Sequence, residues 1–227
     1  QGKSYDAVAQ FKARLEEKRY NNEAVERYGY IQALLRDKKA HQANAELNRL
    51  YQLLHDDPSA SVLRDHVLGK PIRIEYKQII AGAMMETLSA DVLLANGKTA
   101  EALKAYQRGV KIYPQHRALM HGYARALIQD KQPQAALDFI NKQLQFIQND
   151  AQLFGLQAQS YELLGDKMLE HRAQAEVYFL KGHYGAAIDQ LKTALQQGNG
   201  NFYQLSSIEA RLKQLQTLKS DEDKSEK

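Results

Sequence analysis

The residues most able to do chemistry in this chain are histidines and carboxylates, because its 227 residues include no cysteine. Thiolate metal sites, cysteine nucleophiles and disulfides are therefore excluded. A zinc peptidase helix presents two imidazoles in the spacing His-Glu-x-x-His, and none of the 7 histidines lies in that motif. His116 and His121 are too far around a helix to share a metal, and Glu170-His171 has no second ligand at helical spacing. We therefore predict no catalytic residue, metal ligand or cofactor in this chain, which as given is not an enzyme.

Other ligand classes leave no signature either. The chain has no glycine-rich phosphate loop, no Gly-x-Ser-x-Gly turn and no calcium loop. Its 31 basic and 27 acidic residues are interspersed, so the net charge of +4 forms no block that would indicate nucleic-acid binding. The longest apolar run, Ile79 to Met85, falls far short of the roughly 20 residues that a bilayer requires. We expect no nucleic acid and no membrane span.

Helical periodicity runs through almost the whole sequence. Apolar residues recur at i, i+3, i+4 and i+7, as in Leu47, Leu50, Tyr51 and Leu54, whereas alternating strand patterns are scarce. The connections are short, so successive helices should pack antiparallel. We predict an all-α protein with helices over residues 4–19, 22–36, 39–55, 59–68, 72–95, 99–112, 117–129, 133–147, 151–164, 167–181, 184–197 and 201–217.

The turns between these helices recur at a fixed interval. Gly97, Lys131 and Gly165 are spaced by 34 residues, the period of the tetratricopeptide repeat. In that repeat two antiparallel helices bury their apolar faces against each other and against the neighbouring pairs. Aligned on this spacing, Ala102 and Ala136 occupy the sites where two helices approach closely. The pattern predicts an all-α tetratricopeptide-repeat solenoid with extra N-terminal and C-terminal capping helices.

This alignment divides the chain into five segments. Residues 1–23 are expected to be an N-terminal helix or linker from a missing upstream domain, and 24–57 a repeat-like helix pair. Residues 58–82 do not fit the period, which indicates an insertion. Residues 83–217 hold the repeats and a capping helix, and 218–227 are expected to be a disordered tail because they lack large apolar residues beyond Leu218.

A repeat of this kind presents the first helix of each pair along a concave groove, where a partner protein can bind. A chaperone-type carboxylate clamp needs Lys and Asn where this chain has Thr87 and Asp91, so we do not expect a chaperone tail as the ligand. Arg125 and Arg172 could hold a partner's carbonyl groups or carboxylate, because a guanidinium offers a planar fork of donors. The alternative is that these two arginines only keep a helix face soluble. The candidate partner-binding residues are Tyr28, Asp91, His121, Arg125, Gln129, Gln159 and Arg172.

The C-terminal part of the chain has a more particular pattern. It reads Tyr161-Glu-Leu-Leu-Gly-Asp-Lys-Met-Leu-Glu-His-Arg-Ala-Gln-Ala-Glu-Val-Tyr-Phe-Leu-Lys-Gly182, then Ala186-Ala-Ile-Asp-Gln-Leu-Lys-Thr-Ala194 and Ile208-Glu-Ala-Arg-Leu-Lys-Gln-Leu215. This stretch resembles the C-terminal end of bacterial periplasmic zinc metalloproteases that carry a tetratricopeptide tail. Phe11-Lys-Ala-Arg14 and Val25-Glu-Arg-Tyr-Gly-Tyr-Ile-Gln-Ala-Leu34 are similar to the segment that joins protease to tail in that family.

The resemblance implies a periplasmic location and a parent protein that is a zinc metalloendopeptidase acting in outer-membrane protein assembly and quality control. Its zinc would lie in a catalytic domain missing from this chain, so no catalytic residue carries over. The implied partners are the outer-membrane β-barrel assembly machinery and nascent or misassembled outer-membrane proteins. Two alternatives stay open: a structural tail that covers the protease active site, and a generic tetratricopeptide scaffold or adaptor not attached to a protease.

Overall fold

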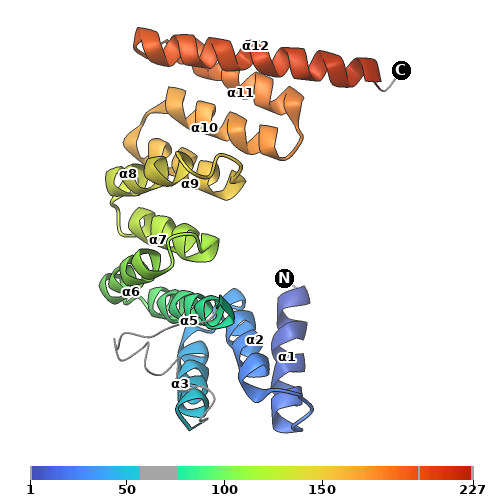
Figure 1. Cartoon of the computed structure of the whole chain (residues 1–227), viewed down its shortest axis with the longest axis vertical. Coiled ribbons are helices and arrows are strands. Elements are labelled where there is room, and N and C mark those ends of the chain that lie inside the picture. Colours follow the sequence, from blue (N-terminus) through green and yellow to red (C-terminus); the bar gives the residue numbers. More distant parts are fainter. Residues whose placement is uncertain (1, 57–75, 199, 226–227) are drawn as a thin grey trace. The chain divides into compact units, whose positions relative to one another are not determined.

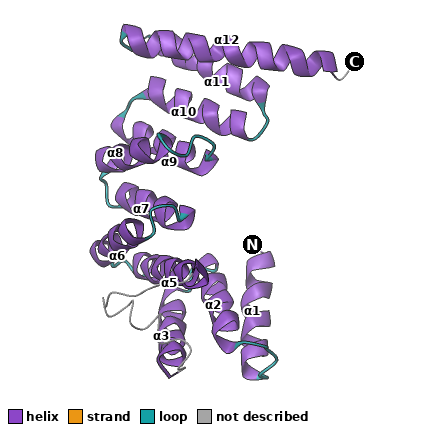
Figure 2. Ribbon diagram, viewed as in Figure 1, coloured by secondary structure: helices purple, strands orange, loops and turns teal. Residues whose placement is uncertain are grey.

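The computed structural model describes residues 2–56, 76–198 and 200–225, and every regular element in these ranges is an α-helix (Figure 2). The chain packs as two compact units, residues 1–126 and residues 127–227, and each is described by itself. Successive helices form antiparallel pairs within each unit, which confirms the predicted all-α tetratricopeptide fold.

Unit 1 contains the N-terminal helices and most of α7 (Figure 1). In this unit α2 packs against α1 and α3, and α5 packs against α6 and, less extensively, against α3 and α2. The helices are α1 (Gly2–Glu16), α2 (Glu23–Arg36), α3 (Ala40–Asp56), α5 (Tyr76–Ala95), α6 (Thr99–Ile112) and α7 (Arg117–Gln129).

Two apolar clusters hold unit 1 together. Leu34, Leu47 and Leu50 are buried between α2 and α3, at the helical spacing seen in the sequence. Ala102 and Tyr106 of α6 are completely buried in a second cluster with residues of α5 and α7. Complete burial of Ala102 is what a small residue at a contact between helices requires.

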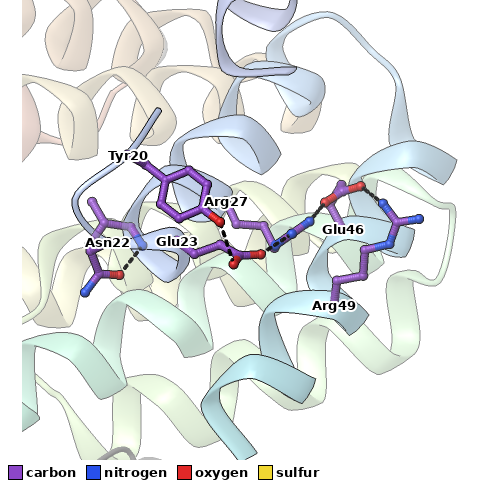
Figure 3. Close-up of polar contacts among 7 residues, drawn as sticks. Tyr20, Asn22, Glu23, Arg27, Glu46 and Arg49 are labelled. Carbon is purple, nitrogen blue, oxygen red and sulfur yellow. Dashed lines mark hydrogen bonds and ion pairs between the residues drawn. The ribbon is translucent and has the colours of Figure 1, made fainter. Parts of the chain in front are cut away.

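A polar network links α2 to α3 at the side of the first cluster. Figure 3 shows Arg27 between Glu23 of its own helix and Glu46 of α3, donating a hydrogen bond to each. Tyr20 Oη donates to Glu23 at 2.9 Å, and Arg49 donates to Glu46 at 2.5 Å. The hydrogen bonds from Arg27 and then Tyr20 lower the pKa of the Glu23 carboxyl. Because Glu46 is buried, its two arginine partners offset the cost of removing its charge from water.

Unit 2 contains the end of α7 and the remaining helices (Figure 1). Here α9 packs against α8 and α10, and α11 packs against α10 and α12. Leu191 of α11 and Ile208 of α12 are fully buried in the core of this end. The helices are α8 (Pro133–Leu144), α9 (Ala151–Leu164), α10 (Lys167–Leu180), α11 (Tyr184–Gln197) and α12 (Phe202–Ser225).

Aspartates set where two helices of unit 2 begin. Asp150 Oδ1 accepts hydrogen bonds from the backbone N–H groups of Gln152 and Leu153, both at 3.0 Å. Asp166 Oδ1 accepts one from the backbone N–H of Leu169, also at 3.0 Å. Each aspartate satisfies backbone donors that have no partner within the helix, so α9 and α10 start at defined residues.

The three turns that predicted the repeat share one backbone conformation. Gly97, Lys131 and Gly165 have φ of 76°, 58° and 77°, which is the left-handed region. Glycine adopts this region without steric cost, whereas lysine does not. The spacing of 34 residues therefore marks a repeated backbone turn. The chain adopts this turn at Lys131 despite the steric cost of a side chain there.

The structure departs from the sequence-based expectation at the end of the chain. Residues 218–225, expected in the disordered tail 218–227, belong to α12, which runs on to Ser225. Lysine and glutamate are good helix formers, and Lys224 pairs with Asp221 at i,i+3, so a polar segment can extend a helix that is already docked.

Two other sequence-based expectations concern residues that the structure does not describe, in whole or in part. The expected helix 59–68 and the first part of the expected insertion 58–82 lie outside the described residues. Residues 76–82 form the first turns of α5.

Candidate functional site

Asp91, a candidate partner-binding residue, is engaged inside unit 1. The hydroxyl of the fully buried Tyr106 donates a hydrogen bond to Asp91 Oδ1, which ties α6 to α5. The Tyr106 ring lies so close to Gly122 of α7 that a Cβ there would be 2.3 Å from Cε1. Burial raises the pKa of the Asp91 carboxyl, while the Tyr106 hydrogen bond and the charge of Arg125 lower it. Asp91 therefore fixes a core tyrosine.

The other candidates of unit 1 lie close to this aspartate or on the same helix face as Arg125. Tyr28 of α2 is half-buried against the first apolar cluster, and burial raises the pKa of its phenol, with Asp91 adding to the rise. His121 and Arg125 are half-buried and four residues apart on α7, so they share a face. The structure thus brings Tyr28, Asp91 and Arg125 near one another as part of the packing of unit 1.

A hollow in unit 2 lies over α9, between α8 and α10. We call it the α9 groove; it has a volume of about 440 Å³. Its lining residues are Asn141 and Leu144 of α8, Phe154, Gln157 and Tyr161 of α9, and Leu169, Arg172, Ala173 and Glu176 of α10.

Hydrogen bonds connect the polar residues across the α9 groove. Gln157 Nε2 donates to Asn141 Oδ1 at 2.7 Å, which links α9 to α8. Burial raises the pKa of the Tyr161 phenol, which the charge of Arg172 and a hydrogen bond with Asn141 partly offset. Tyr161 is therefore protonated at neutral pH and can act as a hydrogen-bond donor.

The two charged residues of the α9 groove differ in their partners. Glu176 accepts hydrogen bonds on both carboxylate oxygens from Arg211 of α12, at 2.8 and 2.6 Å. Arg172 is exposed, and its hydrogen bond to Ser207 Oγ is long at 3.4 Å. Within the described part of the chain, no carboxylate forms an ion pair with Arg172. Among the described residues, no carboxylate therefore neutralises the charge of Arg172 in the groove through an ion pair.

Gln129 and Gln159 lie outside this groove. Gln159 is exposed and sits two residues from both Gln157 and Tyr161, so it points to the opposite side of α9. Gln129 is exposed in the last turn of α7. Of the residues proposed from the sequence, Arg172 alone lines the α9 groove.

Sequence reasoning missed Asn141, Gln157 and Glu176. It assumed that a ligand would bind along the face that holds Asp91, Arg125 and Gln159, which are related by the repeat period. A signal was available: Gln157 and Tyr161, like Arg172 and Glu176, are polar pairs at i,i+4 on helix faces next to the core positions.

Across residues 2–56, 76–198 and 200–225, no three His, Cys, Asp or Glu side chains come together in a group that could hold a metal ion. None of the helices in those ranges combines the length and the hydropathy needed to span a bilayer.

Part of the chain matches a known repeat family. The family model for the tetratricopeptide repeat matches residues 93–160. A crystal structure of a tetratricopeptide repeat protein from Parabacteroides merdae aligns with a TM-score of 0.48 and 14% identity, covering 95% of this chain and 85% of that one.

Curated relatives match a longer part of the sequence. Proteins called beta-barrel assembly-enhancing protease, from Escherichia coli strain K12, Shigella flexneri and Escherichia coli O157:H7, are 30% identical over 133 residues. The matched stretch covers 58% of this chain and 27% of each relative, so the chain spans only about a quarter of their length. The tetratricopeptide family match thus covers residues 93–160, within a series of antiparallel helix pairs.

Proposed function

We propose that this chain is a protein-interaction module that binds its partner in the α9 groove of unit 2. One observation carries the proposal: the groove presents Arg172, without a carboxylate partner among the described residues, beside hydrogen-bonding side chains from three helices. Tetratricopeptide repeats commonly supply rigid surfaces for partner proteins. A site built on three packed helices is preorganised, which lowers the entropic cost of binding.

We further propose that the module serves a periplasmic zinc metalloendopeptidase in outer-membrane protein assembly and quality control. The similarity to beta-barrel assembly-enhancing proteases over 133 residues supports this context. In this proposal zinc and the catalytic residues belong to a domain outside this chain. The chain itself docks onto the β-barrel assembly machinery or onto nascent and misassembled outer-membrane proteins.

Site-specific photocrosslinking in cells of the source organism tests this function. A photoreactive amino acid at Gln157 lies in the α9 groove, whereas the same group at Gln159, two residues along, lies on the opposite side of α9. We expect adducts with β-barrel assembly components or outer-membrane proteins from position 157 and far fewer from position 159. Equal adducts from both positions, or none from 157, would contradict the proposal.

The size of the native protein separates this proposal from a scaffold or adaptor without a protease. An antibody raised against this chain, whose mass is 25.8 kDa, should detect a much larger protein in a cell extract. A zinc-dependent peptidase activity should co-purify with that protein. A native species close to the mass of this chain would favour the adaptor.

A further inference from the structure

The lining of the α9 groove includes two hydrogen-bond donors that can serve a ligand, Tyr161 and Arg172. Gln157 Nε2 donates to Asn141 Oδ1 at 2.7 Å, so this amide pair is engaged between α9 and α8. Tyr161 lines the same groove with a phenol whose O–H can donate to a ligand. Arg172 adds the planar fork of its guanidinium next to this hydroxyl.

The charges in the groove favour an anionic group. Arg211 neutralises Glu176, so Glu176 neither repels an anion strongly nor competes for Arg172. Arg172 is the remaining cation of the lining, with a 3.4 Å contact to a serine hydroxyl as its side-chain hydrogen bond. A carboxylate could accept from the guanidinium with one or both oxygens and from the Tyr161 hydroxyl at the same time.

Apolar side chains complete the groove. Leu144 of α8, Phe154 of α9 and Leu169 of α10 line it together with the polar groups. A ligand that also carries apolar side chains would bury them here, and water would be displaced from around the charged contact. Such partial desolvation strengthens a charge-assisted hydrogen bond.

We propose that the α9 groove recognises an aspartate or glutamate side chain within a partner segment, flanked by apolar residues. This inference rests on the proposed function and adds the chemistry of the ligand. Arg172 is the sixth of the 14 residues of α10 and so lies near the middle of this helix. The carboxylate therefore sits partway along the groove, which suits a side chain of a continuing segment better than a chain end.

Titration of the isotope-labelled chain with three short peptides tests the proposal by NMR. The peptides are N-acetyl-Leu-Glu-Phe-amide, its glutamine counterpart N-acetyl-Leu-Gln-Phe-amide, and N-acetyl-Leu-Phe with a free C-terminal carboxylate. We expect the glutamate peptide to shift the Arg172 Nε–H signal and the side-chain amide signals of Asn141 and Gln157. The glutamine peptide should bind about tenfold more weakly, because it cannot form charge-assisted hydrogen bonds.

Variants of the chain locate the effect. Arg172→Gln should weaken binding of the glutamate peptide about tenfold, and Tyr161→Phe should weaken it by less, since it removes one neutral donor. Lys192→Gln removes the same charge from an exposed residue of α11 outside the groove and should leave binding unchanged. The backbone spectrum of each variant shows that it is folded.

Each other outcome overturns the proposal. Equal binding of the glutamate and glutamine peptides, no shifts at millimolar peptide, or equal losses in Arg172→Gln and Lys192→Gln would show that the groove does not select a carboxylate. Tighter binding of the free C-terminal carboxylate would replace the side chain by a chain end as the ligand. If crosslinks from position 157 persist in any of these cases, the proposed function stands and this inference alone fails.

Discussion

Arg211 of α12 grips Glu176 of α10 with two parallel hydrogen bonds, from Nε to Oε1 at 2.8 Å and from Nη2 to Oε2 at 2.6 Å. The same guanidinium lies 4.3 Å from the ring centroid of Phe179, one turn further along α10. This pair joins the C-terminal helix to a helix that is not its neighbour in sequence. It also fixes one wall of the α9 groove, because Glu176 lines it.

Replacing Arg211 by lysine should weaken the attachment of α12. An ammonium group cannot form the two-pronged hydrogen bond or stack flat on a ring, so we expect a loss of about 1–2 kcal/mol in the free energy of unfolding. Urea denaturation measures this loss, and hydrogen exchange should be faster in α12. Lys213→Ala on the exposed face of the same helix should change stability by less than about 0.5 kcal/mol. Equal effects of the two variants would contradict this account.

The small residues at the helix contacts should not tolerate enlargement. Ala102 and Ala136 are completely buried, so leucine at either site should overpack its helix pair and cost roughly 1–3 kcal/mol. Lys104→Ala on the exposed face of α6 is the control and should stay within about 0.5 kcal/mol. Thermal unfolding of the three variants provides the measurement. Similar melting shifts for all of them would show that the repeat register is wrong.

Lys131 offers a substitution to glycine that should stabilise the protein. Its φ of 58° is unfavourable for lysine by about 1–2 kcal/mol, whereas glycine loses roughly 0.5–1 kcal/mol through its freer unfolded chain. We expect Lys131→Gly to gain about 0.5–1 kcal/mol. Lys104→Gly, the same change inside a helix, should lose about 1 kcal/mol. Chemical denaturation would refute the strain argument if both variants shifted in the same direction.

His116 should make stability depend on pH. Burial lowers its pKa below the ordinary 6.5, and Nδ1 is buried without a hydrogen-bond partner among the described residues. The unfolded chain therefore binds a proton at a higher pH than the folded chain. As pH falls through about 6.5, this histidine should reduce the free energy of unfolding until pH drops below the folded pKa.

The variant His116→Gln, which cannot titrate, isolates that contribution. Urea midpoints of the two proteins at pH 8, 7, 6 and 5 should show a difference that is constant above neutrality. Below it, the wild type should lose stability relative to the variant. A difference that stays the same at every pH would mean that His116 is as accessible to protons in the folded state as in the unfolded one.

Much of the fold was predictable because its signals are local and repeat. The 34-residue period places Ala102 and Ala136 at contacts between helices, and both are completely buried. The end of α12 was not predictable, since its last residues have no apolar pattern and the helix there continues from a segment docked further back. The composition of these last residues does not reveal that the helix is stabilised by the packing of its earlier part.

The candidate site was less predictable, since it depends on which helix face each polar residue occupies. The 34-residue period relates Asp91, Arg125 and Gln159 to one another. It does not reveal that the hydroxyl of the buried Tyr106 donates a hydrogen bond to Asp91. Arg172 was selected for its guanidinium. Its place in a groove beside Asn141 follows from three helices whose relative positions a single sequence does not reveal.

The length of α12 has a mechanical consequence. At about 1.5 Å per residue, its 24 residues form a rod of about 36 Å, whereas the 14 residues of α11 reach about 21 Å. Figure 1 shows the C-terminal end of α12 extending past α11. Residues 220–222 are exposed, so the part of α12 beyond Lys219 is surrounded by water. Lys219 Nζ lies beside Gly185 of α11, so a body fused after Ser225 would be held about 9 Å beyond that contact, in a direction set by the Arg211 anchor.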